Sequence, residues 1–422
     1  MIEDAWRIVG REPLKGTVRP SGSKNGSLPA LAATLLLDGE TMLHNVPRIA
    51  DVQTMTALLG AVGLTVEERG DSSLRIVNHG IATHRAPAEL VARMRASHYL
   101  LGPMLLRLGR AEMAMPGGCN LGSRPVTHIT SVLETLGATG TISDNTIELS
   151  ASRLRGAVVA LDPRHRNPGA TFTALMAASL AAGETVIENA SYEPDVICFC
   201  NFLNAAGARI EGMGRPRLIV EGVAALRGVE HRVNSDRLEA GTFICAAAST
   251  RGEVMVDDIT LAELGETADK LREAGVELMP RGGGLVATCP GRPRGVDVVT
   301  DPFPAFSTDL QPVAAALLAT AEGESRIEET VYDRRLQYAH ELMKMGASIE
   351  LPDSRHAVIH GVERLRGAAV EGCNIRDGAA LVVAALSAHG ESIVSGRQFV
   401  ARGYEDFEGK LRSLGAEIGP AG

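Results

Sequence analysis

Hydrophobic and glycine positions repeat along the chain with a long period. The pattern Leu-x-x-x-Gly, followed by an apolar residue three positions after the glycine, begins at residues 59, 203, 271, 342 and 411, and a looser copy begins at residue 133. Its glycines stand at 63, 137, 207, 275, 346 and 415, at intervals of about 70 residues. An Ala/Leu-rich stretch ending in Gly-Glu-Thr or a relative keeps the same phase, with glycines at 39, 109, 183, 252, 323 and 390. Two markers with one period predict six repeated units.

Each unit contains the signals of two helices and two or more strands. The Ala/Leu-rich stretch predicts an apolar helix ending at the glycine, because glycine readily adopts the left-handed cap conformation. Alternating segments such as TMLHNV and TVIENA then predict a strand. A second helix runs to Leu-x-x-x-Gly, and segments such as ARIEG and ASIEL predict a second strand. The chain is therefore predicted to be an α/β protein whose units are too large for a solenoid.

Six units suit two lobes of three units each. We expect the first lobe to contain residues 22–232, and the second to contain residues 1–21 together with 233–422. The strand segment RIVGREPLKGTVRP precedes the first complete unit, so we expect it to complete the second lobe. The chain would then cross between the lobes twice, near residues 20–22 and 231–235.

Composition excludes several classes of protein. The 422 residues carry a net charge of −9 and only 3% aromatic side chains, so there is neither a basic field nor a set of stacking platforms for nucleic acid. The start MIEDAWRIVG lacks a signal-peptide core, and no apolar run approaches the roughly 18 residues that span a bilayer. The six cysteines form no CxxC pair and no His cluster completes a zinc set, so we expect no metal and no membrane contact. A reducing cytoplasm is the simplest expected location.

The stretch MPGGCNLGSRPV, residues 115–126, is the first candidate for chemistry. Cys119 follows two glycines and precedes Arg124 by five residues. A cation near a thiol lowers the pKa of that thiol and makes it more reactive. The alternative interpretation is a flexible turn with a buried thiol.

Further candidates stand beside turns and helix starts. SGSKNGS, which contains Lys24 and Asn25, is either a capped helix start or an anion site, and it lacks the GxxxxGK[ST] pattern of a P-loop. Asp309 precedes an apolar helix, a position typical of a helix cap. The local sequence around Arg95, Arg376 and Arg402 is consistent either with surface charges or with anion-binding residues.

The six repeats, SGSKNGSLP near the start, the Cys119 loop and RGYE near the end together resemble the enolpyruvyl transferase family along the whole chain. The resemblance is strongest to its UDP-N-acetylglucosamine branch. It implies a two-lobe inside-out α/β barrel with the active site in the interlobe cleft. It also implies transfer of the enolpyruvyl group of phosphoenolpyruvate to an alcohol, with release of phosphate and without metal or cofactor.

The resemblance also implies roles for individual residues. Cys119 would act as a general acid or a covalent nucleophile and would be alkylated by fosfomycin, on a loop that closes as a lid. Asp309 would be the general base. The implied catalytic residues are Cys119, Asp309, Lys24 and Arg402. The implied phosphoenolpyruvate ligands are Lys24, Arg95, Arg124, Arg376 and Arg402. The implied acceptor ligands are Asn25, Arg124, Pro125, Val126, Arg164, Arg166, Gly169, Asp309 and Val331.

The sequence departs from the family mainly on the acceptor side. An Asp-x-His motif is replaced by Thr127 and Ile129, and a Ser-Val-Gly turn that holds diphosphate is replaced by DPRHRNPGAT, residues 162–171, about two residues longer. Asn374 stands where the family has an acid. The added basic residues 164–166 would either meet a terminal phosphate or form a solvated loop.

These departures leave the acceptor open. They slightly favour a paralogue that enolpyruvylates the 3′-hydroxyl of UMP, as in nikkomycin and polyoxin biosynthesis. The alternative acceptor is the 3-hydroxyl of UDP-N-acetylglucosamine, in the first committed step of peptidoglycan synthesis. A catalytically silent nucleotide-binding paralogue is the alternative from another class, and the presence of Cys119 and Asp309 argues against it. The oligomeric state is left open.

Overall fold

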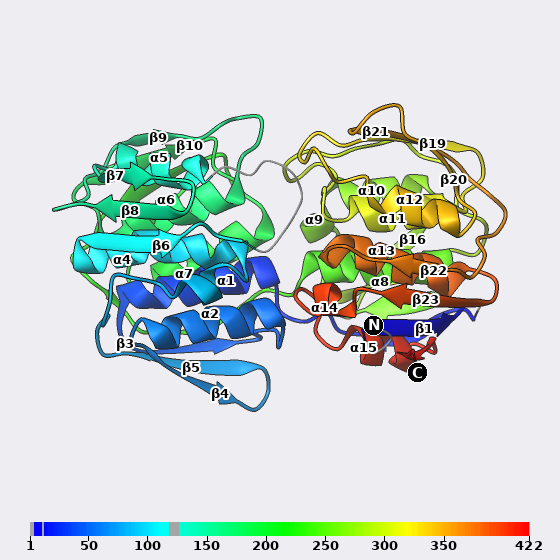
Figure 1. The fold of residues 1–422 in the computed structure, drawn as a ribbon, viewed down its shortest axis with the longest axis horizontal. Helices are drawn as coiled ribbons and strands as arrows, with labels where there is room; N and C mark the ends of the chain where they lie inside the picture. Colours follow the sequence, from blue (N-terminus) through cyan, green and yellow to red (C-terminus); the bar gives the residue numbers. More distant parts are fainter. Residues whose placement is uncertain (1–3, 11, 118–125, 422) are drawn as a thin grey trace. The chain divides into compact units, whose positions relative to one another are not determined.

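The computed structural model describes residues 4–10, 12–117 and 126–421. Cys119, Arg124 and Pro125 therefore lie outside the described residues. Within the described part, the chain forms two compact units (Figure 1). We call residues 22–117 and 126–234 the N-terminal unit, and residues 4–21 and 235–421 the C-terminal unit.

Apolar helices form the centre of each unit. In the N-terminal unit they are α1 (Lys24–Ala33), α4 (Leu101–Leu108) and α6 (Pro168–Leu180), and in the C-terminal unit α8 (Arg237–Ser249), α11 (Gln311–Leu318) and α13 (Ile375–Ser387). Every residue of α13 from 376 to 386 is buried, and α8, α11 and α13 contact one another. The second helix of each repeat is α2 (Ala50–Ala61), α5 (Thr127–Thr135), α7 (Pro194–Ala205), α10 (Glu266–Glu273), α12 (Tyr338–Lys344) or α15 (Phe407–Ser413). Short helices are η1 (Thr34–Leu36), α3 (Ala88–Val91), η2 (Arg95–Leu100), α9 (Leu261–Leu264) and α14 (Arg397–Val400).

Three sheets surround the helices of the N-terminal unit. The first contains β13 (Leu226–Arg227), β14 (Glu230–Arg232), β3 (Leu37–His44), β5 (Ser73–Asn78) and β4 (Thr65–Arg69). The second contains β6 (Arg110–Ala114), β8 (Thr146–Ser150) and β7 (Thr139–Ile142). The third contains β9 (Val158–Ala160), β10 (Glu184–Glu188), β12 (Arg217–Glu221) and β11 (Arg209–Glu211).

The C-terminal unit has three sheets of four strands. The first contains β22 (Ala369–Glu371), β23 (Glu391–Ser395), β1 (Ala5–Val9) and β24 (Glu417–Pro420). The second contains β2 (Lys15–Val18), β15 (Glu253–Val256), β17 (Gly284–Thr288) and β16 (Glu277–Arg281). The third contains β18 (Val298–Val299), β19 (Glu324–Glu328), β21 (His356–His360) and β20 (Ser348–Glu350).

The layers explain the hydrophobic pattern of the sequence. Strands such as β19 alternate exposed and buried residues, because one face covers the helices and the other meets solvent. The central helices are apolar all round because they are enclosed. The predicted α/β class is confirmed, with helices inside and sheets outside. No described strand joins two of these sheets by hydrogen bonds. The described strands of each unit therefore form separate sheets and not one closed, hydrogen-bonded barrel.

The Leu-x-x-x-Gly marker is a helix-ending motif used six times. The Gly207 amide donates to the Asn204 carbonyl at 3.0 Å, and the Ala208 amide donates to the Leu203 carbonyl at 2.9 Å. The same pair of bonds ends α2, α5, α10, α12 and α15. The six glycines have φ between 88° and 118°, where a Cβ is disfavoured. This is the Schellman motif, and the leucine supplies the carbonyl that accepts its outer bond.

The second glycine marker has a different role at one position. Gly39, Gly109, Gly183, Gly323 and Gly390 take positive φ as expected, but only Gly109 directly caps its helix. The prediction of a left-handed conformation is wrong at Gly252, because the preceding residue, Arg251, takes the positive φ of 53° instead. A Cβ on Gly252 would stand 2.1 Å from the Leu14 carbonyl oxygen. This glycine therefore permits the close approach of the segment that leads into β2.

Residues near the two ends of the chain share one sheet. Strand β1 pairs antiparallel with β23 and with β24, and the Ala421 amide donates to the Ala5 carbonyl at 2.9 Å. Strand β2 pairs in parallel with β15. The first described residues thus supply strands to two sheets of the C-terminal unit.

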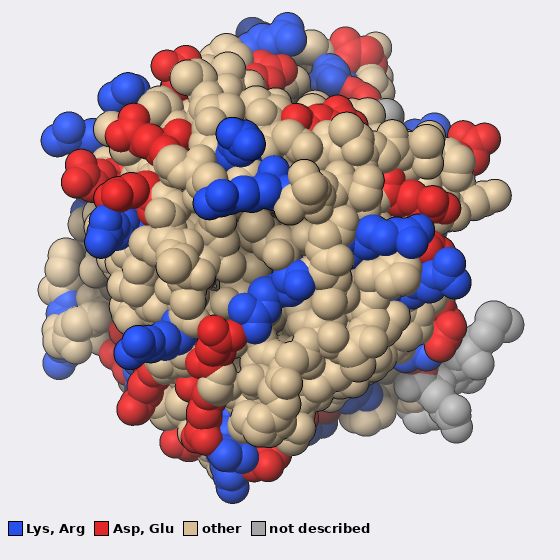
Figure 2. Space-filling view, turned by 90° about the vertical axis from the view of Figure 1, so that its left-hand side faces the viewer, with Lys and Arg blue, Asp and Glu red and all other residues tan. Residues whose placement is uncertain are grey.

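The described surface carries mixed charge. Figure 2 shows lysines and arginines next to acids, separated by uncharged areas, on the visible face. None of the described helices is long and apolar enough to cross a membrane.

Candidate active site

Lys24 is held at the start of α1 by a buried carboxylate. Ser23 caps this helix by accepting a hydrogen bond from the Gly26 amide at 3.2 Å. The Lys24 ammonium lies 2.7 Å from Asp51, whose side chain is only 4% exposed and belongs to the first turn of α2. Lys24 itself is 13% exposed, and Asn25 follows it. A fixed ammonium at a helix N-terminus is a suitable ligand for an anion.

Arg95 and Gly169 lie at neighbouring helix starts in the same unit. His98 Nδ1 lies 2.7 Å from the Arg95 carbonyl oxygen, and a carbonyl only accepts, so this nitrogen donates. A Cβ on Gly169 would stand 3.5 Å from His98 Nε2 and 3.6 Å from Ile129 of α5. The ends of η2, α5 and α6 therefore meet here, and the buried Val126 directly precedes α5. Sequence reasoning did not identify His98, which looks like an ordinary apolar-face position.

The loop 162–167 divides its basic residues between two partners. Asp162 accepts the Arg164 amide at 2.9 Å and contacts His165 Nδ1 at 3.0 Å, and these bonds lower the pKa of Asp162 to about 2. The Arg164 side chain is 83% exposed. Arg166 donates to the Tyr192 hydroxyl at 3.0 Å and lies over its ring. Arg164 and His165 thus turn back on their own loop, whereas Arg166 is fixed against the body of the unit.

Asp309 is clamped by two buried arginines in the C-terminal unit. Arg335 Nη2 lies 2.5 Å from Asp309 Oδ1. Arg376 donates through Nε and Nη2 to Asp309 Oδ2, at 3.2 and 3.1 Å. The arginine side chains are 1% and 6% exposed, and that of Asp309 is 28% exposed. The helix-cap interpretation of Asp309 is wrong, because Leu310 precedes α11 and no side chain caps that helix.

Glu329 is a buried residue that sequence reasoning missed. Its carboxylate accepts the Val331 and Tyr332 amides at 2.8 and 2.9 Å and the Thr308 hydroxyl at 2.9 Å. Glu329 is 0% exposed. Its hydrogen bonds hold the turn that contains Val331 beside Thr308, the residue that precedes Asp309. In β19, which ends just before Glu329, the acids Glu324 and Glu328 are exposed. This pattern gave no signal that the next acid, Glu329, is buried.

Asn374 and Tyr404 contact Arg376. Asn374 caps α13 by accepting the Arg376 and Asp377 amides at 3.0 and 3.1 Å. Burial raises the pKa of Asp377 to about 6, against the opposing effects of Arg335 and the Asn374 hydrogen bond. Arg376 lies over the Tyr404 ring at 5.4 Å. Arg402 occupies the turn after α14, two residues before Tyr404.

The cap role of Asn374 leads to a stability prediction. Asn374→Ala should lower the free energy of unfolding by about 1 kcal/mol, because two helix amides lose their acceptor. Asn374→Asp should change it by less than about 0.5 kcal/mol, since Asp and Asn cap equally well. Urea unfolding of both variants measures the difference. Equal losses in the two variants would contradict a capping role.

Asp236 and Glu239, at the start of α8, form a second buried charge cluster with Lys410. Asp236 caps α8, and Glu239 contacts the Lys410 ammonium at 2.5 Å and accepts the Ser21 amide at 3.0 Å. Burial raises the pKa of Glu239 to about 7, although Lys410 opposes this shift. The cluster fixes the last residue before the chain enters the N-terminal unit.

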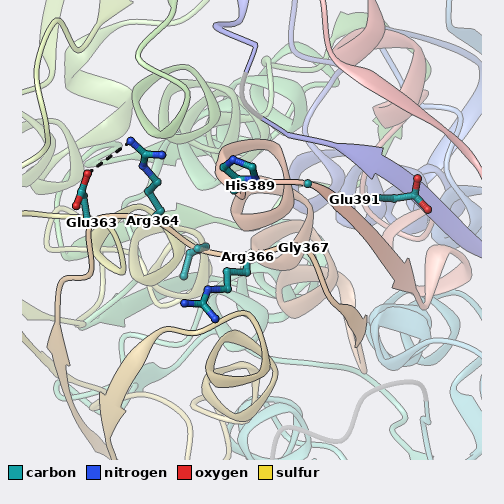
Figure 3. A pocket seen from close by; sticks show the side chains of 8 residues that line it. Glu363, Arg364, Arg366, Gly367, His389 and Glu391 are labelled. Atoms are coloured by element: carbon teal, nitrogen blue, oxygen red, sulfur yellow. Dashed lines mark ion pairs between the residues drawn. The ribbon is translucent and has the colours of Figure 1, made fainter.

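A surface pocket of about 600 Å³ in the C-terminal unit contains none of the predicted site residues (Figure 3). Its lining includes Arg364, Arg366 and His389, and Glu363 lies 3.6 Å from Arg364. The described residues contain no group of three or more His, Cys, Asp or Glu that could hold a metal ion.

Comparison with known proteins assigns the chain to a family. Residues 8–411 match the family described as EPSP synthase (3-phosphoshikimate 1-carboxyvinyltransferase). The chain belongs to this family. It is 45% identical to the UDP-N-acetylglucosamine 1-carboxyvinyltransferase of Paracoccus denitrificans over 97% of both chains. It is 43% identical to that of Gloeobacter violaceus, over 98% of this chain and 89% of the relative.

Solved structures agree with the family assignment. The enolpyruvyl transferase NikO from Streptomyces tendae matches with a TM-score of 0.89 and 26% identity, over 99% of each chain. An EPSP synthase from Acinetobacter baumannii matches with a TM-score of 0.73 and 19% identity, over 99% of this chain and all of that one, and supports the fold alone. As a member of the EPSP synthase family, the protein is an enolpyruvyl transferase of the carboxyvinyl type.

Proposed function

We propose that this enzyme transfers the enolpyruvyl group of phosphoenolpyruvate to a secondary hydroxyl of a uridine nucleotide and releases phosphate. The supporting observation is the pair Arg335 and Arg376, two buried arginines that hold one carboxylate in a chain of the EPSP synthase family. Phosphoenolpyruvate carries a carboxylate, and planar guanidinium groups suit carboxylates because they form paired hydrogen bonds.

The proposal divides the ligands of the donor by chemistry. Lys24, Arg95 and Arg124 bind its phosphate, and Arg376 and Arg402 bind its carboxylate. The remaining assignments concern the acceptor nucleotide and comprise Asn25, Pro125, Val126, Arg166, Gly169 and Val331. Arg164 is left out of this proposal, because its side chain is exposed and turns toward Asp162. Because ammonium and guanidinium groups supply the positive charge, this scheme needs no metal ion for phosphate departure.

The proposed reaction is an addition followed by an elimination. Asp309 removes the proton of the acceptor hydroxyl, whose oxygen bonds to C2 of phosphoenolpyruvate while Cys119 protonates C3. The bond from C2 to the phosphate oxygen then breaks and C3 loses a proton, which restores the double bond. Phosphate and the enolpyruvyl ether of the nucleotide are the products.

The start of α6 favours UMP as the acceptor. Pro168 has no amide hydrogen, and the Ala170 amide is already capped by Asn167 at 3.1 Å, so fewer backbone donors face a diphosphate here. Arg166, fixed beside this helix start by Tyr192, supplies a full charge instead. A terminal phosphate carries more charge than a bridging diphosphate group, so a guanidinium suits it better.

UDP-N-acetylglucosamine is the second candidate acceptor. The observation that favours it is the 43–45% identity, over almost the whole chain, to relatives named for that substrate. On this alternative, the changes at residues 162–171 are tolerated differences within a cell-wall enzyme.

The deciding experiment measures phosphate release from phosphoenolpyruvate with UMP or UDP-N-acetylglucosamine as the sole acceptor. Product mass is determined in parallel. Turnover with UMP alone supports the first acceptor, and turnover with UDP-N-acetylglucosamine alone supports the second. No phosphate release with either would contradict the proposed function and favour a silent nucleotide-binding paralogue.

Arg166 and Arg164 provide a matched pair of variants. Arg166→Gln should raise the KM for the nucleotide by about ten- to a hundredfold, because a charge-assisted bond to phosphate is worth about 1.5–3 kcal/mol. Arg164→Gln should change the KM less than about twofold, since that side chain is exposed and turns toward Asp162. Steady-state kinetics on both variants test this. Equal effects would mean that the loop acts only through its overall charge.

A further inference from the structure

The carboxylate of Asp309 occupies the hydrogen-bonding edge of Arg376. That edge, formed by Nε and Nη2, makes both of its bonds to Asp309 Oδ2. Arg335 uses Nε on the Thr308 carbonyl at 3.2 Å and Nη2 on Asp309 Oδ1. Both oxygens of Asp309 thus accept from guanidinium donors, and the Nε and Nη2 edge of Arg376 is of the kind that planar carboxylates prefer.

Burial makes this arrangement exclusive. The arginine side chains are 1% and 6% exposed, so their heads are fixed by the surrounding protein. Asp309 is 28% exposed and is the outermost member of the three. Acidic groups whose charge acts on the two arginines include Asp377 and Glu329 on Arg335 and Asp236 on Arg376. An incoming carboxylate can therefore reach the paired edge of Arg376 only by replacing Asp309.

We propose that Asp309 stands in for the carboxylate of the donor substrate in the resting enzyme, and that donor binding displaces it. This inference rests on the proposed function, in which Arg376 binds the carboxylate of phosphoenolpyruvate. One carboxylate replaces another, so the charge around the buried arginines is conserved and no covalent bond forms or breaks. Displacement frees the oxygens of Asp309.

The exchange links the two substrates through one residue. Asp309 Oδ1 accepts from Arg335 and Oδ2 accepts from Arg376, so the two arginines use part of the lone-pair capacity of each oxygen and hold the carboxylate in place. A general base must come within hydrogen-bond distance of the proton that it removes. Release of the guanidinium bonds by the donor makes the Asp309 carboxylate more available and more basic, so the acceptor hydroxyl is activated more strongly when its electrophile is bound.

The inference makes an unusual prediction for Asp309→Asn. An amide offers one acceptor oxygen and two donor hydrogens, so it cannot satisfy both guanidinium groups as a carboxylate does. Phosphoenolpyruvate then has no competitor for the arginines. Asp309→Asn should bind phosphoenolpyruvate about tenfold more tightly than the wild type, while phosphate release is lost.

Isothermal titration of the full-length chain with phosphoenolpyruvate tests this. Asp269→Asn is the matched control: it makes the same charge change on α10, where the side chain of Asp269 is 75% exposed. The control should bind like the wild type. Equal or weaker binding by Asp309→Asn, in a protein whose wild type binds phosphoenolpyruvate and releases phosphate, would overturn the inference alone. A wild type that neither binds nor releases would overturn the proposed function as well.

A second measurement covers the case in which Asp309→Asn does not fold. A crystal structure of the wild type with phosphoenolpyruvate should show the donor carboxylate on Arg376 and Asp309 beyond 4 Å from that guanidinium, the usual limit for an ion pair. Asp309 remaining on both arginines with the donor bound would contradict displacement.

Discussion

Replacing Lys24 with methionine is expected to lower the free energy of unfolding by about 3–5 kcal/mol and to abolish phosphate release. The Lys24 ammonium is 2.7 Å from Asp51, a carboxylate with 4% exposure. Without the ammonium, that buried carboxylate loses the opposite charge 2.7 Å away, which is the costly case for a buried ion pair. Urea unfolding gives the stability, and a phosphate assay gives the activity.

A double variant separates the two roles of Lys24. Lys24→Met combined with Asp51→Leu replaces the pair with apolar groups of similar size and should recover most of the lost stability. It should remain inactive, because the phosphate of the donor loses Lys24, one of its three proposed cationic ligands. Recovery of activity together with stability would show that Lys24 serves only to hold α1 against α2.

The second large effect is expected at Cys119, which lies outside the described residues. Cys119→Ser should abolish covalent labelling by fosfomycin, because serine lacks a comparably acidic and nucleophilic group. The measurement is the mass of the intact protein after incubation with fosfomycin. Labelling that persists in Cys119→Ser would place the reactive thiol elsewhere.

Cys373 provides the control for this experiment. Its thiol is exposed, but partial desolvation and nearby acids such as Asp377 and Glu371 raise its pKa, which keeps it protonated. Cys373→Ser should therefore be labelled as completely as the wild type. Loss of labelling in this variant would mean that the reagent follows exposure instead of reactivity.

The repeated architecture could be predicted from the sequence because its signals are local. Each Leu-x-x-x-Gly lies in one helix end, and the requirement for positive φ acts on the glycine itself. The turn at Asp162 also depends only on neighbouring residues, since an aspartate side chain commonly accepts a hydrogen bond from the amide two residues later. The exception at Gly252 follows from a distant segment, because the crowding atom belongs to Leu14.

The candidate site could be predicted only in part, because its pairings are distant in sequence. Asp309 meets Arg335 across 26 positions and Arg376 across 67, and neither separation leaves a periodic signal. The local sequence favoured a helix cap at Asp309, whereas in the folded structure its carboxylate pairs with two arginines. The role of Glu329 could not be predicted for the same reason, since its hydrogen-bond partner Thr308 lies 21 positions away in another loop. The resemblance to a family named most candidates, but only the structure supplied their partners.

The sheet that contains β1 affects the order in which the chain can fold during synthesis. Strand β1 is made first, but its partner β24 is completed just over 400 residues later, after a delay on the order of half a minute at typical translation rates. The N-terminal unit, residues 22–234, emerges whole in the meantime. The N-terminal unit can therefore be finished while β1 and β2 are both still unpaired, and the C-terminal unit is completed only when β24 pairs with β1.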